Sequence, residues 1–212
     1  MNKSLYSLIF MDEVVKGIDK AAYSLKTSRS ALINQILADY LSLKTPEYHT
    51  GEVFGIVGRQ LEADSDIKVC EGGSANILSL RSALNYKYNP TLRYTVTLTP
   101  DGDSILGRME AALRTQNKLL INKVSGFYYI WATVLGNGEN DAVHNEGYVI
   151  EDAKYVGNFR IYGDYRSMSE SDTAALVTAY VRHFDDSIKK FFGLPEDECS
   201  EILLNLNNGK EE

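Results

Sequence analysis

The sequence predicts an α+β protein of two parts. Near the amino terminus, one short apolar run precedes two segments whose apolar residues recur at helical spacing. Residues 77–99 alternate between apolar and polar side chains across an Asn-Pro turn, as an antiparallel hairpin does. Residues 171–192 carry a long apolar helical stripe. We therefore expect a small domain over residues 1–46, and an α+β domain with an antiparallel hairpin or sheet and packed helices over residues 47–212.

The apolar run at residues 3–10 is typical of a strand with one decidedly apolar face. Its two sides are Tyr6, Leu8 and Phe10 on one, and Lys3, Leu5, Ser7 and Ile9 on the other. No second strand follows for dozens of residues, so the backbone groups of this strand have no partner nearby. The simplest partner is the same strand of a second chain, paired antiparallel about a two-fold axis.

Two helices follow this strand. The first is predicted over about residues 12–24, with Asp12 as its N-cap. The second begins after a cap at Thr27 or Ser28, and Pro46 prevents its continuation. A unit of about forty residues buries too little surface to hold a core alone, so it needs a partner chain.

The order of these elements over residues 3–43 resembles the ribbon-helix-helix proteins of the CopG, MetJ and Arc type. The pieces FMDEVVKGIDKAA and LKTSRSALINQILADYL carry the resemblance, and SRSALI is its most specific part. The resemblance implies an intertwined homodimer whose paired strands enter the major groove of double-stranded DNA. It implies base contacts from Lys3, Leu5, Ser7 and Ile9, and phosphate contacts at the amino end of the second helix, around Lys26, Thr27, Ser28, Arg29 and Ser30.

One feature of the predicted ribbon departs from the family pattern. Base-reading ribbons usually carry polar side chains, whereas Leu5 and Ile9 can touch thymine methyl groups but cannot form bidentate hydrogen bonds. Ser7 and Lys3 are the polar readers. The alternative is that another domain covers the apolar outer face, and the two arrangements can coexist as bound and inhibited states.

Charge is distributed unevenly along the chain. Residues 1–44 contain six basic and four acidic residues, a net charge of +2, which leaves −9 for the remainder of a chain whose total is −7. A basic amino-terminal part can approach DNA while the rest of the protein is repelled from it.

The second domain begins with a linker or helix end at residues 42–51 and a connecting helix that ends near residue 66. The hairpin at 77–99 buries one face, and its other face presents three cations, Arg81, Lys87 and Arg93. A solvated sheet face is the simplest reading of that second face, and a contact with phosphate or an acidic ligand is the alternative.

The remaining elements follow from periodicity. We expect a helix over residues 103–120, with Ser104 as its cap. The apolar segment 127–136 fits a buried strand or a buried helix equally. A loop at 137–147 and two short strands at 148–163 follow. The last helix, 171–192, has Gly193 as its C-cap and Pro195 as its stop.

Catalytic and metal-binding patterns are absent from the sequence. It contains no phosphate-binding glycine loop, GxSxG or HExxH motif, and His49, His144 and His183 are scattered. Cys70 and Cys199 lie far apart without metal-ligand spacing, which suits a reducing cytoplasm. The amino-terminal run is too short for a signal peptide, and no segment is long enough to span a membrane.

We therefore expect a cytoplasmic transcriptional regulator that binds double-stranded DNA as a homodimer or higher oligomer, is not an enzyme, and requires no metal or cofactor. The second domain serves oligomerisation or sensing, with no effector identified. The alternative is a protein-interaction module, such as an antitoxin or a conjugation or partition accessory factor, built on the same dimeric amino terminus.

Overall fold

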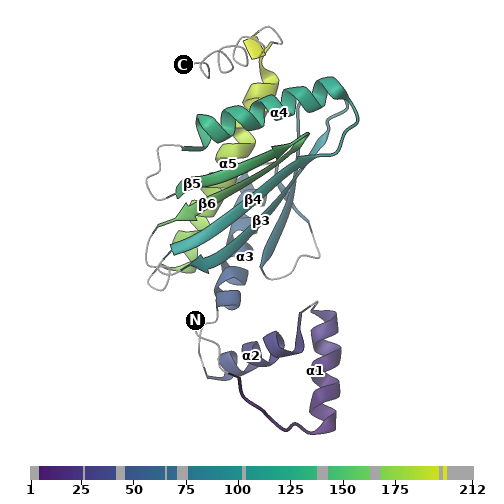
Figure 1. Ribbon diagram of the computed structural model, residues 1–212, viewed down its shortest axis with the longest axis vertical. Coiled ribbons are helices and arrows are strands. Elements are labelled where there is room, and N and C mark those ends of the chain that lie inside the picture. Colours follow the sequence, from purple (N-terminus) through teal and green to yellow (C-terminus); the bar gives the residue numbers. More distant parts are fainter. Residues whose placement is uncertain are drawn as a thin grey trace. The chain divides into compact units, whose positions relative to one another are not determined.

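The structure, a computed structural model, describes the chain in segments (Figure 1). The described residues are 5–25, 27–41, 46–64, 66–70, 76–101, 104–137, 143–162, 168–195 and 198–199. The chain divides into two compact units, Met1–Tyr48 and His49–Glu212. The division falls inside helix α3, Pro46–Asp64, so part of the predicted linker is helical. Pro46 begins this helix, where its missing amide hydrogen costs nothing.

The first unit contains two helices behind an amino-terminal segment. Helix α1 spans Asp12–Ser24 and α2 spans Arg29–Tyr40, and both lie where the sequence predicts a helix. Residues 5–11 form neither helix nor strand within one chain. The strand predicted there is therefore not formed by a single chain, and it stays a prediction for two.

The two helices of the first unit begin in different ways. The N-cap of α1 is Met11, which makes no side-chain cap bond; the expectation that Asp12 would be the cap is wrong. Asp12 instead opens the helix, where its carboxylate lies favourably at the positive end of the dipole. At α2, the Ser28 hydroxyl oxygen accepts a hydrogen bond from the Ala31 amide at 3.1 Å. Of the two candidate caps, Ser28 therefore fills the role.

The second unit is built on a six-stranded antiparallel sheet in the order β1-β2-β3-β4-β6-β5. The strands are β1 Lys68–Val69, β2 Ile77–Ala83, β3 Thr91–Asp101, β4 Ser104–Leu113, β5 Val143–Glu151 and β6 Lys154–Ile161. Strands β2 and β3 form the predicted hairpin, with Leu80 opposite Tyr94. The two late strands predicted at 148–163 are also confirmed as β5 and β6, although β5 begins earlier, at Val143.

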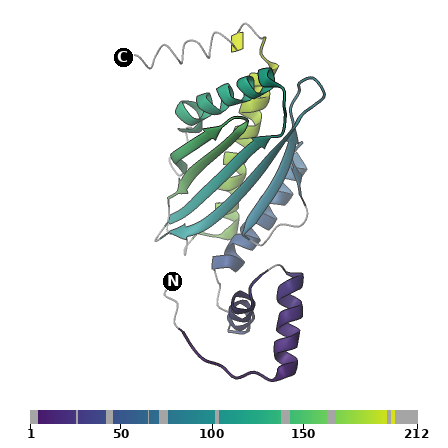
Figure 2. The ribbon, with the colours of Figure 1, turned by 45° about the vertical axis from the view of Figure 1, so that its right-hand side comes forward.

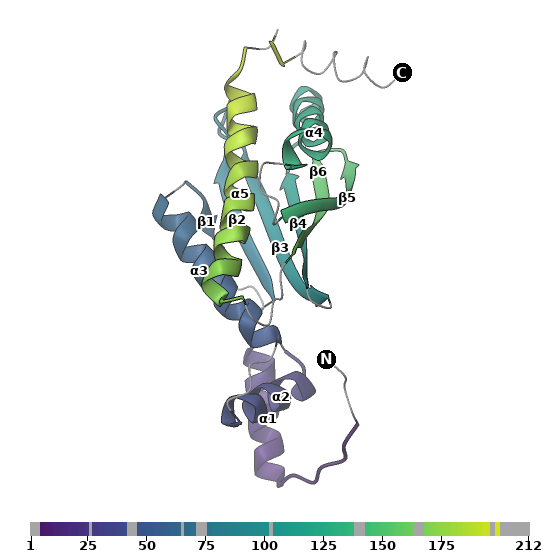
Figure 3. The ribbon, with the colours of Figure 1, turned by 90° about the vertical axis from the view of Figure 1, so that its left-hand side faces the viewer.

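Three helices cover one face of the sheet: α3, α4 (Lys118–Thr133) and α5 (Glu170–Gly193) (Figure 3). A short 3₁₀ turn, Leu135–Asn137, follows α4. Along β4, fully buried residues alternate with more exposed ones, as expected when only one face is packed. Within the second unit, no described element covers the other face, which is turned toward the viewer in Figure 2. We call it the open face.

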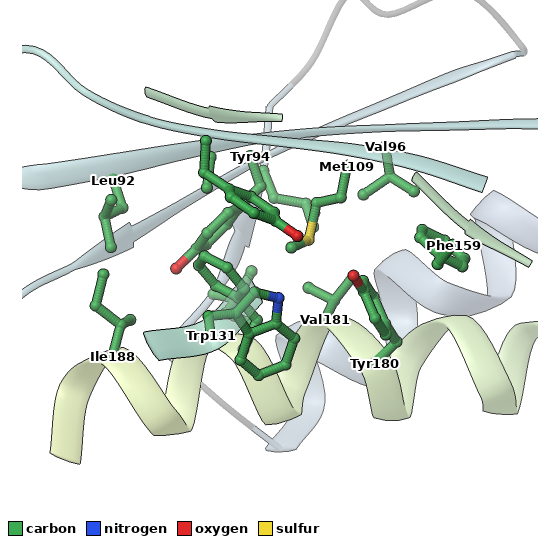
Figure 4. Packing of buried hydrophobic residues seen from close by; sticks show 14 of the residues in the cluster. Leu92, Tyr94, Val96, Met109, Trp131, Phe159, Tyr180, Val181 and Ile188 are labelled. Carbon is green, nitrogen blue, oxygen red and sulfur yellow. The ribbon is translucent and has the colours of Figure 1, made fainter. Parts of the chain in front are cut away.

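Phe184 of α5 lies at the centre of the core, completely buried. Its ring contacts the rings of Tyr94, Phe127, Tyr128, Trp131 and Tyr155, with centroids 4.8–6.1 Å apart. Figure 4 shows Tyr94 and Trp131 in the space between the sheet and α5. Such edge-on and tilted ring pairs add to the stabilisation that burial provides. Helices α4 and α5 and the sheet therefore share one hydrophobic core.

A polar pair is buried in the same core. The Tyr94 hydroxyl donates to a carboxylate oxygen of Asp185 at 2.7 Å, and the Lys189 ammonium lies 2.8 Å from the other oxygen. Burial and the adjacent Asp185 hold the pKa of the Tyr94 phenol well above its ordinary value. The phenol therefore stays a neutral donor, and the arrangement satisfies each buried group.

Segment 103–120 is where the sequence interpretation is wrong. Residues 104–113 form strand β4, paired with β3 and β6, and the helix begins only after the Asn117 cap. The apolar residues fit a period of two as well as a helical period, and they alternate into the core at Ile105, Met109 and Leu113. Helix α4 also shows that the undecided segment 127–136 is helical as far as Thr133.

The last helix matches its prediction closely. Helix α5 runs from Glu170 to Gly193, against a predicted 171–192. Gly193 is its last helical residue and Leu194 is the C-cap, so the cap prediction is wrong by one residue.

Candidate nucleic-acid interface

The amino-terminal segment presents its side chains to solvent. Leu5 and Ile9, expected on the outer side, are 98% and 102% exposed. Tyr6 and Leu8, expected on the inner side, are 81% and 61% exposed. Ser7 is exposed as well, and Lys3 lies outside the described residues. Within the first unit, both sides of the segment therefore lack a core, as expected for a strand that a second chain completes.

The backbone of this segment is also unpaired. In the part of the chain that the structure describes, the first backbone bonds of the unit are those that the Val14 and Val15 amides donate to the Met11 carbonyl. Residues 5–10 thus keep their N–H and C=O groups available for another strand.

The amino end of α2 is an open donor site. The Ser28 hydroxyl oxygen accepts a hydrogen bond from the Ala31 amide, and the Ser28 carbonyl oxygen accepts one from the Leu32 amide. The Arg29 and Ser30 amides have no described partner. Those amides lie at the positive end of the helix dipole, where anions bind well. The Thr27 amide is bonded to the Ala22 carbonyl at 3.0 Å, so of Thr27 only the exposed side chain remains free for a ligand. Lys26 lies outside the described residues.

The Arg29 side chain is not free. Its Nη2 donates a hydrogen bond to Oδ2 of Asp19 on α1 at 2.8 Å, and its Nε forms an ion-pair contact with Oδ1 of the same carboxylate. This pair ties the start of α2 to α1 and partly neutralises the expected positive charge. Both side chains remain substantially exposed, so a phosphate can compete with Asp19 for the guanidinium.

The three hairpin cations do not form one group. Arg81 and Arg93 are directly opposite each other on β2 and β3 and both are exposed. Lys87 is in the connection between these strands and is therefore off the sheet face. In its place the structure puts Lys68 of β1 directly opposite Arg81. We call Lys68, Arg81 and Arg93 the cation row.

Sequence reasoning missed Lys68 because β1 has two residues. The signal was present in Ile67-Lys68-Val69, where a polar residue stands between two apolar ones, and Ile67 is fully buried. So short a run gave no period to detect.

Elsewhere on the open face, cations are paired with acids. Glu110 lies 3.1 Å from Arg108 and 2.8 Å from Lys154, and its hydrogen bond with Lys154 holds the pKa of the carboxyl below its ordinary value. Arg160 binds Asp101 at 2.6 Å and also contacts Glu146. These contacts raise the pKa of the Arg160 guanidinium. This part of the face is electrically balanced.

The histidines and cysteines are apart from one another. The His183 ring lies 5.1 Å from Trp131, His144 lies against Tyr162, and His49 is 3.5 Å from Glu170. Among the described residues, no three His, Cys, Asp or Glu side chains are grouped to hold a metal ion. Cys70 and Cys199 are both free thiols.

No family model matches the chain, and no curated protein matches it. None of the described helices has the length and apolar character to cross a membrane.

Proposed function

We propose that the chain is a sequence-specific DNA-binding transcriptional regulator that acts as a homodimer through residues 5–11. The observation that carries the proposal is the exposure of this apolar segment, with its backbone unpaired, in front of two helices. Two copies paired antiparallel would satisfy the backbone groups and bury Tyr6, Leu8 and Phe10. The order of elements resembles the ribbon-helix-helix proteins, in which such a ribbon enters the major groove.

The amino end of α2 supplies the phosphate contact in this proposal. The amides of Arg29 and Ser30, which have no partner among the described residues, and the exposed Arg29 guanidinium favour an anion. A phosphate contact positions the protein but carries no base information. Arg29→Glu should therefore weaken binding to all duplexes alike and lower the salt dependence of the affinity by roughly one counterion.

Asp19→Asn is the matched variant for this test. It removes the acid that holds Arg29 and keeps the side-chain shape, so binding to all duplexes should become several-fold tighter. Titrations of labelled duplexes at several salt concentrations measure both effects. If Arg29→Glu leaves the affinity intact, the phosphate assignment is wrong.

The outer side of the ribbon supplies the sequence preference. Leu5 and Ile9 can contact thymine methyl groups, and Ser7 can hydrogen-bond to a base edge. Selection from random duplexes with the intact protein at low salt should enrich a two-fold symmetric site containing thymines. Replacing those thymines with uracil should weaken binding, since each substitution removes one methyl group. Ser7→Ala should instead change which sites are preferred.

The exposed aliphatics also favour a second candidate, a protein-interaction module with the same dimeric amino terminus. In the proposed dimer, Leu5 and Ile9 of both chains place four large aliphatic side chains on a small surface. Such a surface usually marks a contact, and it suits a protein partner as well as thymine methyl groups. Selection that enriches no site, with an intact dimer at low salt, would reject the regulator and favour this module.

A further inference from the structure

The open face of the sheet divides into two halves that differ in charge pairing. Over β4, β6 and β5, the cations Arg108, Lys154 and Arg160 each contact an acid. Over β1, β2 and β3, the cation row Lys68, Arg81 and Arg93 forms an ion pair with no described residue. Both halves belong to one continuous sheet, so the difference lies in the side chains.

The three cations of the row lie close enough to repel one another, which destabilises the fold when no acid lies between them. Lys68 is paired with Arg81, and Arg81 with Arg93, in the registers of adjacent strands. Side chains directly opposite each other lie about 5 Å apart, and like charges in such pairs are destabilising. Two strand spacings make the row about 10 Å long. The fold thus holds three mutually repelling charges in line without an acid from the described chain.

We propose that the cation row binds the phosphate backbone of a DNA duplex. The choice of ligand rests on the proposed function, and the site adds a second contact that is separate from the amino-terminal ribbon. A duplex carries about one negative charge per 1.7 Å of its axis, so a row about 10 Å long meets several phosphates. Bound phosphate supplies the counter-charge that no described residue gives to the row.

The surroundings of the row favour a duplex over other anions. Small ligands bind in concave sites. This row crosses three neighbouring strands of the sheet, and a depression on the same face lies instead over Val149 and Val156. The neighbouring open-face side chains on β2 and β3 are Ile77, Ser79, Ala83, Thr91, Thr95, Thr97 and Thr99. None is aromatic, so the face offers no stacking platform for single-stranded bases. Its hydroxyl groups can donate to phosphate oxygens.

The test compares two double variants of the full-length chain. Arg81→Gln with Arg93→Gln removes two charges from the row. Lys118→Gln with Lys190→Gln removes two exposed charges from α4 and α5, which cover the opposite face. Both variants change the net charge equally, so a difference between them reports position. Affinity for one selected duplex is measured from about 50 to 200 mM salt.

The row variant should bind roughly tenfold more weakly at low salt, with the slope of log K against log salt reduced by about 1.8. The ranking of duplex sequences should not change. The helix variant should keep the wild-type slope. The thermal midpoint of the row variant should not fall below that of the wild type, because two repulsions have been removed. Equal slopes for the two variants would overturn the proposal.

An acidic protein segment is the alternative ligand for the cation row, and poly-glutamate serves as the probe for it. If the row variant loses poly-glutamate binding and keeps its DNA affinity, the row takes acidic protein and the proposal fails. The proposed function fails separately if the wild type binds duplexes through the row but shows no sequence preference and no response to Arg29→Glu. Absence of duplex binding at low salt would reject both.

Discussion

The two units of the chain differ in how far they bury their large apolar side chains. In the second unit, Phe184, Trp131 and Tyr94 are at most 1% exposed. Among the described residues of the first unit, the buried apolar ones are the small Ala22 and Ala38 and the single larger Leu32, while Ile9 and Leu5 are fully exposed. A unit of more than 150 residues can close a core by itself, and one of fewer than fifty rarely can. We therefore expect the first unit to depend on a partner for its stability and the second unit to be stable alone.

The largest expected effect is on the first unit. Leu8→Asp places a charge on the side of residues 5–11 that the proposed dimer buries, so at micromolar concentration the dimer should be lost, together with the helical signal of α1 and α2. Sedimentation measures the dimer and circular dichroism measures the helices. Trp131, the single tryptophan, reports the second unit, whose unfolding should not change.

Ile9→Asp is the matched variant, one residue along the chain and on the other predicted side. It should keep the dimer and lose DNA binding. Equal loss of the dimer in both variants would show that the segment does not pair as a ribbon, because the two sides would then be equivalent.

The next effect is confined to the second unit. Phe184→Ala removes the ring that five other aromatic rings contact, and it should lower the free energy of unfolding by about 3 to 5 kcal/mol. Denaturant titration followed by Trp131 fluorescence measures the loss. The midpoint should be independent of protein concentration, in contrast to that of the first unit. A concentration-dependent midpoint would mean that the second unit also relies on a partner.

How far the sequence predicts this fold depends on how long each period lasts. The helices α1 and α5 and the hairpin β2–β3 were predicted because each pattern persists over several turns or alternations. Segment 104–113 contains Met, Glu, Ala and Leu, which favour helices in isolation. Its strand conformation is set by pairing with β3, which precedes it, and with β6, which follows only after α4 and β5, so tertiary contacts override local preference.

Gly107 shows this override at a single position. A Cβ atom there would lie 2.2 Å from the ring of Phe159, which is itself stacked on Tyr180 at 4.3 Å. Gly107→Ala raises helix propensity, yet it should destabilise the second unit by about 1 to 3 kcal/mol through overpacking. Thermal unfolding measures this. A stabilised variant would favour the helix that the sequence suggested, and Gly55→Ala on α3, which has room for a methyl group, is the control.

The candidate sites were predicted in the same uneven way. Ser28 was found because capping has a local signature. The pairing of Arg29 with Asp19 was not, since it joins two helices across a turn. Lys68 was missed and Lys87 was misplaced because residue types alone do not predict the register of a sheet or the length of the connection between two strands.

The smallest expected effect belongs to the paired half of the open face. Hydrogen bonds from Lys154 and Arg108 lower the pKa of the Glu110 carboxyl from its ordinary value of 4.5, so near that pH the unfolded chain binds more protons than the folded one. The stabilisation is therefore complete above about pH 4.5 to 5 and disappears as the pH falls through the lowered folded-state pKa.

Glu110→Gln should cost roughly 0.2 to 1 kcal/mol at pH 7, as exposed pairs do, and almost nothing near pH 3. Urea unfolding at both pH values measures the difference, and Glu52→Gln on the exposed side of α3 is the control. A cost that is equal at both pH values would show that Glu110 contributes by packing against its neighbours. The two halves of the open face would then differ less in charge than their contacts indicate.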